Sequence, residues 1–85
     1  MADMNMINIL KENVKEELND CMKYADLAAV ARDKGEPNHS QMFRDMAKEE
    51  YLHAGHNNRM LKQQGSNTNE FQDMWMKAEK AVYGL

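Results

Sequence analysis

The sequence predicts an all-α protein, a long antiparallel helical hairpin followed by a short C-terminal helix. Residues 4–34 and 38–64 form two long stretches without a helix breaker, and both carry apolar residues at helical spacing. Pro37, the only proline, lies between them, where a tight turn would bring the two helices side by side. A third, shorter apolar repeat covers residues 68–83. We therefore predict one small domain over residues 1–85.

Composition and charge exclude several classes of protein. The chain is 42% hydrophobic and 29% charged, which is typical of a folded helical protein and not of a disordered tail. Its formal net charge is -3 and it has no basic cluster, so we expect no nucleic-acid partner and no membrane partner. Residues 1–10 lack the pattern of a signal peptide, and no stretch is apolar enough to span a bilayer. A cytoplasmic location is therefore expected.

The first helix, residues 4–34, is expected to bury a stripe with a carboxylate at its centre. Glu17 lies on this stripe and Tyr24 lies two turns further along, whereas Glu16 points about 100° away. Cys21 also lies on the stripe and, as the only cysteine, is expected to be a buried thiol rather than a reactive one. The apolar members of the stripe are Met6, Leu10, Val14, Cys21, Ala25 and Ala28.

The second helix, residues 38–64, is expected to follow a Gly-Glu-Pro turn, with Asn38 or Ser40 as its N-cap. It carries Glu50 and His53, whose side chains project from one face of the helix and can bind the same ion. Apolar residues lie within about 60° of Glu50, so both side chains are expected to face the core. The inner stripe consists of Phe43, Met46, Ala47, Glu50, His53, Asn57, Met60 and Leu61.

Two carboxylates, one from each helix, are expected to meet in the core. The sequence midpoint between Glu17 and Glu50 falls just before the turn, which puts both at nearly the same height in the hairpin. Glu49, like Glu16, points away and is expected to be solvated. An unpaired carboxylate in apolar surroundings is costly, so a chain that buries Glu17, Glu50 and His53 is expected to bind a cation with them.

A polar linker separates the second helix from the third. In this linker Asn67 and Glu70 have the spacing of a capping box. The third helix, residues 68–83, has one apolar face that must pack on the hairpin or on a neighbouring subunit. That face consists of Phe71, Met74, Trp75, Ala78 and Val82.

One chain supplies half of a two-metal site. The carboxylate-bridged di-iron or di-manganese sites of helix bundles take one Glu from each of two helices and Glu-x-x-His from each of the other two. Glu17, Glu50 and His53 are half of that set, so two copies related by a two-fold axis would complete it in a four-helix bundle. We predict a homodimer or higher homo-oligomer with two iron ions per dimer, manganese or zinc being alternatives.

The spacing of these residues resembles that of the rubrerythrins, a ferritin-like di-iron family, over roughly residues 17–61. The resemblance covers one helical hairpin, the first half of the ferritin-like domain. It implies that Glu17 and His53 are terminal metal ligands and that Glu50 bridges two irons. It also implies that the Tyr24 phenol hydrogen-bonds a ligand carboxylate, which assigns Tyr24 to the catalytic site. The matching positions are Glu17, Tyr24, Gly35, Phe43, Ala47, Glu50, His53 and Ala54.

The sequence also departs from the pattern of that family. The second helical hairpin is missing, which a homodimer would restore. The rubredoxin domain, with its paired Cys-x-x-Cys iron site, has no counterpart in these 85 residues, so an external electron donor is expected. Rubrerythrins carry an additional glutamate three residues after the first ligand of the second hairpin. The corresponding residue here is Asp20, whose side chain is shorter.

Several residues have a second interpretation. The Glu-x-x-His pair alone is also compatible with a chance surface pair, and Tyr24 with simple core packing. Asn57, one turn past His53, is either a hydrogen-bond partner of a ligand or a satisfied core amide. We interpret His39, which falls on the inner stripe far from Glu50, as structural or as a residue of the bundle end, and His56 as solvated.

The sequence supports one leading functional hypothesis and two alternatives. The leading hypothesis is a non-haem di-iron oxidoreductase that reduces hydrogen peroxide or oxygen or oxidises ferrous iron. The first alternative is an iron-storage or iron-handling protein with ferroxidase activity. The second is a non-catalytic helical interaction module that holds a structural metal or none. Only the first two require a redox-active metal on Glu17, Glu50 and His53.

Overall fold

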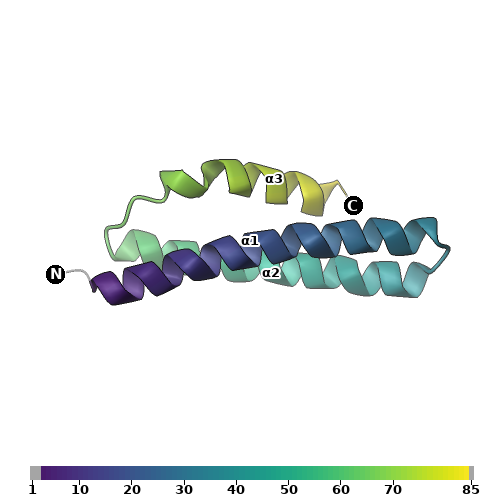
Figure 1. Ribbon diagram of the computed structural model, residues 1–85, viewed down its shortest axis with the longest axis horizontal. Coiled ribbons are helices and arrows are strands. Elements are labelled where there is room, and N and C mark those ends of the chain that lie inside the picture. The colour runs from purple at the N-terminus through teal and green to yellow at the C-terminus, as the bar shows by residue number, and fades with distance from the viewer. Residues whose placement is uncertain (1–2, 85) are drawn as a thin grey trace.

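The computed structural model describes residues 3–84 as three α-helices and one short 3-10 turn. The elements are α1 (Met4–Asp33), α2 (Pro37–Gln63), η1 (Asn69–Phe71) and α3 (Gln72–Tyr83). No strand occurs in the described range, and the predicted all-α class is confirmed. Figure 1 shows α1 and α2 lying antiparallel, with α3 along one side of this hairpin. Three residues of the predicted domain lie outside the described range: 1, 2 and 85.

The two ends of α1 are set by local chemistry. At its start, Asp3 is the N-cap, and its Oδ1 accepts hydrogen bonds from the backbone N–H groups of Asn5 and Met6 at 3.0 and 3.2 Å. At its end, Gly35 has a φ of 74°, a left-handed conformation that a residue with a Cβ adopts only with strain. The chain therefore reverses directly after α1.

The start of α2 differs from the prediction. The helix begins at Pro37, one residue earlier than expected. Proline is tolerated in the first turn because its missing N–H removes no helical hydrogen bond there. The N-cap is Glu36, without a side-chain capping bond, so the prediction of Asn38 or Ser40 as the cap is wrong. Ser40 is buried instead, and its hydroxyl donates to the backbone oxygen of Ala28 at 2.8 Å. This bond links α2 to α1 near the turn.

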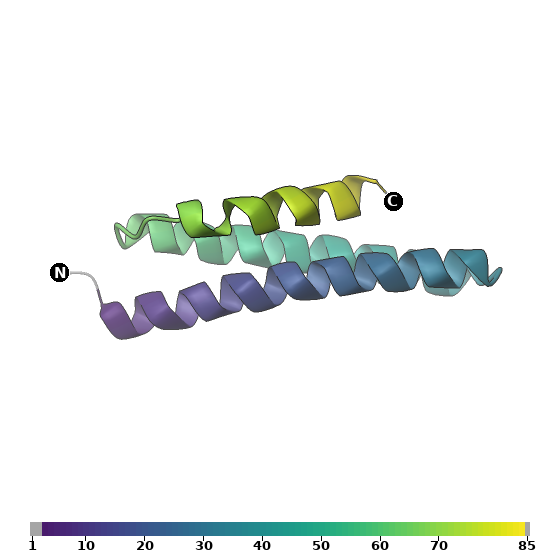
Figure 2. The same ribbon diagram turned by 45° about the horizontal axis from the view of Figure 1, so that its top comes forward.

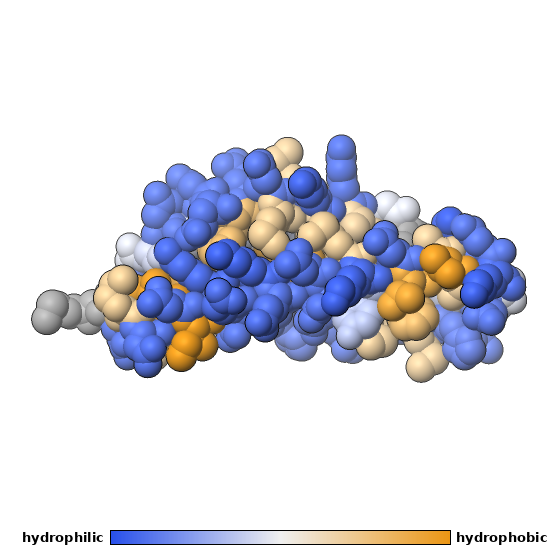
Figure 3. Space-filling view, viewed as in Figure 1, coloured by the Kyte–Doolittle hydropathy of each residue, from blue (hydrophilic) through white to orange (hydrophobic). Residues whose placement is uncertain are grey.

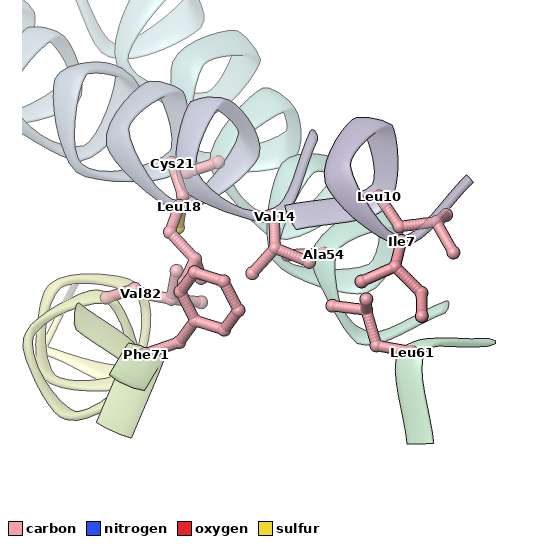
Figure 4. Packing of buried hydrophobic residues seen from close by; sticks show 11 residues of the cluster. Ile7, Leu10, Val14, Leu18, Cys21, Ala54, Leu61, Phe71 and Val82 are labelled. Atoms are coloured by element: carbon pink, nitrogen blue, oxygen red, sulfur yellow. The ribbon is translucent and has the colours of Figure 1, made fainter. Parts of the chain in front are cut away.

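The third helix covers one side of the hairpin and completes the core (Figure 2). In Figure 4, the side chains of Phe71 and Leu18 point toward one another, and both are fully buried. Tyr51 of α2 meets Trp75 of α3 edge-on, with ring centroids 5.4 Å apart. The buried cluster consists of Ile7, Leu10, Val14, Leu18, Cys21, Ala47, Ala54, Leu61, Phe71, Ala78 and Val82.

The linker before α3 forms only part of the predicted capping box. Asn67 Oδ1 accepts a hydrogen bond from the backbone N–H of Asn69 at 2.9 Å, as a turn-forming Asn does. The Glu70 carboxylate lies 2.9 Å from Lys11 Nζ of α1, so it forms an ion pair across the fold. The N-cap of η1 is Thr68 and that of α3 is Phe71. Neither makes a side-chain capping bond, so the reciprocal capping box is not formed.

The buried sector of the hairpin is rotated relative to the prediction. Met6 and Met60, assigned to the inner stripes, are 45% and 42% exposed. Ile7 and Leu18 are buried instead. The reason is the position of α3, which packs near Leu18, about 100° around α1 from Glu17. Burial therefore shifts toward α3 and away from the opposite side of the hairpin.

That opposite side, which we call the open side, carries exposed apolar residues at both ends of the hairpin. Helical spacing places Met6, Ile9 and Leu27 there on α1, and Met42 and Met60 there on α2. All five are at least 42% exposed. In Figure 3 the most strongly hydrophobic colour lies near both ends of the molecule, and the surface between them is mostly hydrophilic with some paler apolar atoms.

Within residues 3–84, none of the helices combines the length and the apolar character needed to cross a bilayer.

Candidate metal centre

Glu17, Glu50 and His53 come together about halfway along the hairpin. Each offers one ligand atom, and these atoms lie within 4.8 Å of one another. Glu17 extends from α1, and the other two residues extend from α2. The antiparallel hairpin therefore brings two carboxylates and one imidazole to one place, at the height that the position of the turn predicts.

The two ligand candidates of α2 are already paired with each other. His53 Nδ1 lies 3.2 Å from Glu50 Oε1, as the spacing of three residues along a helix allows. The Glu50 side chain is 23% exposed, but the His53 side chain is 56% exposed. The prediction that both face the core is therefore wrong for His53. The buried face of α2 is centred on Ala47, Ala54 and Leu61, which leaves His53 on the open side.

Glu17 is held by a residue of the other helix. Asn57 Nδ2 donates a hydrogen bond to Glu17 Oε1 at 2.5 Å, and both side chains are half-buried. Of the two interpretations of Asn57, the structure shows a hydrogen-bond partner of a ligand candidate. Its position one turn beyond His53 was the signal for this role, because that spacing keeps a side chain on the same face of α2.

Tyr24 and Asp20 lie on α1 beside Glu17 but do not join the group. Tyr24 is half-buried and packs against the core cluster. Among residues 3–84, no hydrogen bond is formed by its hydroxyl. Asp20 Oδ1 lies 3.8 Å from Lys23 Nζ, a partly exposed pair on the same helix. Within residues 3–84, neither residue therefore forms a hydrogen bond or an ion pair with a ligand candidate.

The acidic and histidine residues predicted to be solvated are all exposed. Glu16 and Glu49, the sequence neighbours of the two ligand carboxylates, point to solvent. His56 is exposed as well. His39 was instead placed on the inner stripe, and the structure shows it exposed at the turn end of the bundle, with Nδ1 3.4 Å from Glu36 Oε2. The helical phase used to select the ligand carboxylates thus separates them correctly from their neighbours.

Cys21 lies buried in the core next to the site. Its side chain is fully buried, and burial, followed by the charge of the Glu50 carboxylate, raises the pKa of the thiol to about 11. The thiol is therefore protonated at neutral pH, and a protonated thiol is a poor metal ligand. The prediction of a buried thiol is confirmed. The proximity of Cys21 to Glu50 was not predicted. The signal for it was that Cys21 lies one turn from Glu17, which was itself expected to meet Glu50.

The three donors fit a hard or borderline transition metal. Carboxylate oxygens and a neutral imidazole are ligands that suit iron, manganese and zinc. Three side chains leave an octahedral ion unsaturated, and the group opens onto the side of the hairpin that α3 does not cover. Further ligands can therefore reach an ion on Glu17, Glu50 and His53 from outside this chain.

Comparison with known families gives one match. Residues 8–82 match the family described as Rubrerythrin, a range that includes all three ligand candidates and most of α1, α2 and α3. No curated protein and no solved structure matches the chain significantly.

Proposed function

The chain belongs to the rubrerythrin family, a ferritin-like di-iron family, and from this premise we propose that it is a non-haem di-iron oxidoreductase. The proposed reaction is reduction of hydrogen peroxide or oxygen, or oxidation of ferrous iron. Membership of the family supports metal binding of the di-iron type. The proposal extends this to a particular set of ligands, an assembly and a reaction.

The convergence of Glu17, Glu50 and His53 within 4.8 Å is the observation that carries the proposal. We assign a terminal ligand role to Glu17 and His53 and a bridging role to Glu50. When bound, two ferrous ions would supply the two electrons that reduction of one peroxide molecule requires. A carboxylate in the role proposed for Glu50 would offset the charge of two cations held close together, which a neutral ligand could not do.

We propose that a second copy of the chain completes the site. One chain provides two glutamates and one histidine, half of the set that a di-iron site in a helix bundle uses. The same side of the hairpin carries exposed apolar residues toward both ends, which a second hairpin would cover. The group lies near the middle of α2 (Pro37–Gln63), so a two-fold axis through it lets two hairpins overlap along most of their length.

Tyr24 is retained in the proposed catalytic site. Its spacing of two helical turns places its ring on the same side of α1 as Glu17. Its hydroxyl makes no hydrogen bond within the described residues, so it is available to donate to a carboxylate of the assembled site. An external electron donor and a cytoplasmic location are also part of the proposal.

Metal content per chain and native mass, measured on the same sample, test the shared site. After loading with ferrous iron without oxygen, we expect a dimer or a larger assembly with two irons per dimer. A folded monomer that retains iron would overturn the proposed assembly. Protein that binds no iron at all would overturn the function.

Stopped-flow spectroscopy of the iron-loaded protein tests the reaction. We expect hydrogen peroxide to oxidise the ferrous protein faster than oxygen does, and turnover to need an added reductant. Oxidation by neither oxidant would favour a non-catalytic helical module with a structural metal. Growth of an iron mineral during repeated additions of ferrous iron would favour storage with ferroxidase activity.

A further inference from the structure

We propose that Asn57 is a positioning residue that orients the Glu17 carboxylate before metal binds. This inference rests on the proposed function, because it assigns Asn57 a role in metal binding. Asn57 Nδ2 donates to Glu17 Oε1 at 2.5 Å across the hairpin, between residues 40 positions apart. Within residues 3–84, no other hydrogen bond joins a side chain of α1 to a side chain of α2.

The other two ligand candidates do not need such a contact. Glu50 and His53 lie on one helix, and their 3.2 Å contact is fixed by the helical spacing itself. Glu17 extends from α1, and no residue of its own helix forms a hydrogen bond or an ion pair with its carboxylate in the described range. Without the Asn57 amide, the Glu17 side chain would sample several rotamers, and metal binding would have to order it.

An amide suits this role better than a charged donor would. A carboxylate oxygen has two lone pairs, so one N–H···O bond leaves acceptor capacity on both oxygens for a metal. Lys or Arg at the same place would also orient Glu17, but its positive charge would repel the incoming cation. Asn57 orients the ligand and leaves the negative charge of the site unchanged.

Asn57→Ala and the matched variant Asn58→Ala test the proposal. Asn58 is the next residue and is also half-buried, but it lies on the α3 side of α2, where it lines a pocket together with Trp75. Affinity for ferrous iron, and for cobalt(II) as a redox-inert probe, is measured by competition titration. Circular dichroism confirms that both variants remain helical.

We expect Asn57→Ala to weaken metal affinity about 10- to 100-fold, the usual effect of removing a group that orients a ligand. Asn58→Ala is expected to bind metal like the wild type. Equal affinity of Asn57→Ala and the wild type would overturn this inference while leaving the proposed function intact. A wild-type protein that binds no metal would overturn both.

A double-mutant cycle in the metal-free protein separates positioning from packing. Asn57→Ala is made in the wild type and in Glu17→Ala, and the thermal unfolding temperature is measured for each. We expect Asn57→Ala to change that temperature in the wild type and to have little effect once Glu17 is gone. An equal change in both backgrounds would mean that Asn57 acts through packing alone, and would overturn the assignment.

Discussion

At the scale of single residues, each ligand carboxylate has a neighbour of the same type that points elsewhere. Glu17 and Glu50 are half-buried, whereas Glu16 and Glu49 are exposed. The two members of each pair carry the same charge but point about 100° apart around the helix axis. Substitutions within these pairs therefore distinguish a site from a general effect of negative charge.

Glu17→Ala and Glu50→Ala are expected to abolish binding of two metals, because each substitution removes a ligand from both halves of a symmetric site. His53→Ala is expected to weaken binding and redox activity while the bundle stays folded. Removing one of two adjacent carboxylates also relieves repulsion, so the metal-free Glu50→Ala variant should be at least as stable as the wild type. In Glu17→Ala the same relief is opposed by loss of the hydrogen bond from Asn57. Metal per chain by mass spectrometry and thermal unfolding provide the measurements.

Glu16→Ala and Glu49→Ala serve as the controls for this experiment. Both residues are exposed, so each substitution is expected to change stability by no more than about 0.5 kcal/mol and to leave metal binding unchanged. Loss of metal in either control, with retention in Glu17→Ala or Glu50→Ala, would contradict the helical phase on which the site is built.

Tyr24→Phe is expected to keep the metals and to change the rate at which peroxide oxidises the ferrous protein. The substitution removes a hydroxyl and leaves the half-buried ring, so the fold should be retained. Tyr83→Phe is the matched control, because Tyr83 is 74% exposed at the end of α3. Stopped-flow rates that are identical for the wild type and both variants would remove Tyr24 from the catalytic site.

The raised pKa of Cys21 predicts that the folded protein loses stability at alkaline pH. Its pKa is raised from 9.0 to about 11 in the folded protein, so the thiol of the unfolded chain ionises first as the pH rises. Stability is therefore lost between about pH 9 and 11 and is unaffected by this group below that window. Guanidinium unfolding of the metal-free protein and of Cys21→Ala at pH 8 and pH 10 measures the effect. The difference in free energy of unfolding between the wild type and Cys21→Ala should be smaller at pH 10 than at pH 8. An unchanged difference would mean that burial does not raise the pKa of the thiol.

At the scale of helices and turns, local chemistry predicts that each element exists. It predicts less well which of the element's residues are buried. Uninterrupted apolar spacing and the Gly35 turn suffice to predict the hairpin, because they act over a few residues. The burial of Ile7 and Leu18 in place of Met6 and Met60 was not predictable, because it depends on where α3 packs. Contacts between helices also override the capping preference of Ser40, because its hydroxyl donates a hydrogen bond to a backbone carbonyl of α1 and does not cap α2.

The candidate site was predictable for a similar reason. Glu50 and His53 are related by helical spacing, and Glu17 is related to them by the position of the turn. The exposure of His53 could not be predicted, because it follows from the side that α3 leaves uncovered. A hydrogen bond from Asn57 to a ligand was one of two interpretations, and only the three-dimensional structure distinguishes them.

The third helix is expected to stabilise the hairpin without contributing ligands. Phe71 is 1% exposed and packs in the buried cluster with residues of α1 and α2. Phe71→Ala should therefore lower the free energy of unfolding by about 3–5 kcal/mol, while the ligand candidates remain in place. Met76→Ala, at a 59% exposed position of the same helix, should cost little. Similar unfolding midpoints for the two variants would show that α3 does not stabilise the core.

At the scale of the whole molecule, the hairpin has one covered side and one open side. The covered side carries α3, and the open side carries the ligand candidates between two groups of exposed apolar residues. A second copy that binds to the open side would bury both the ligands and the apolar residues. The proposed dimer interface and the proposed site are therefore the same surface.

Leu27→Glu is expected to shift the native protein from dimer to monomer and to reduce its metal content. Leu27 is 43% exposed on the open side, so a charge there would be desolvated by a second hairpin. Leu52→Glu is the control, because Leu52 is 61% exposed and lines a pocket with Tyr83 on the α3 side of the hairpin. Analytical ultracentrifugation measures the assembly. Dimers that persist in Leu27→Glu, or that disappear equally in both variants, would contradict an interface on the open side.

The exposure of His53 in a single chain has a consequence for how the protein would respond to iron supply. If half of a coordination shell lies on each subunit, metal binding and subunit association are linked equilibria, and each must favour the other by the same factor. The apparent affinity for iron should then rise with the concentration of the chain, and the dissociation constant of the dimer should fall as ferrous iron is added. Such a protein would convert the iron level of its surroundings into a change in its own assembly.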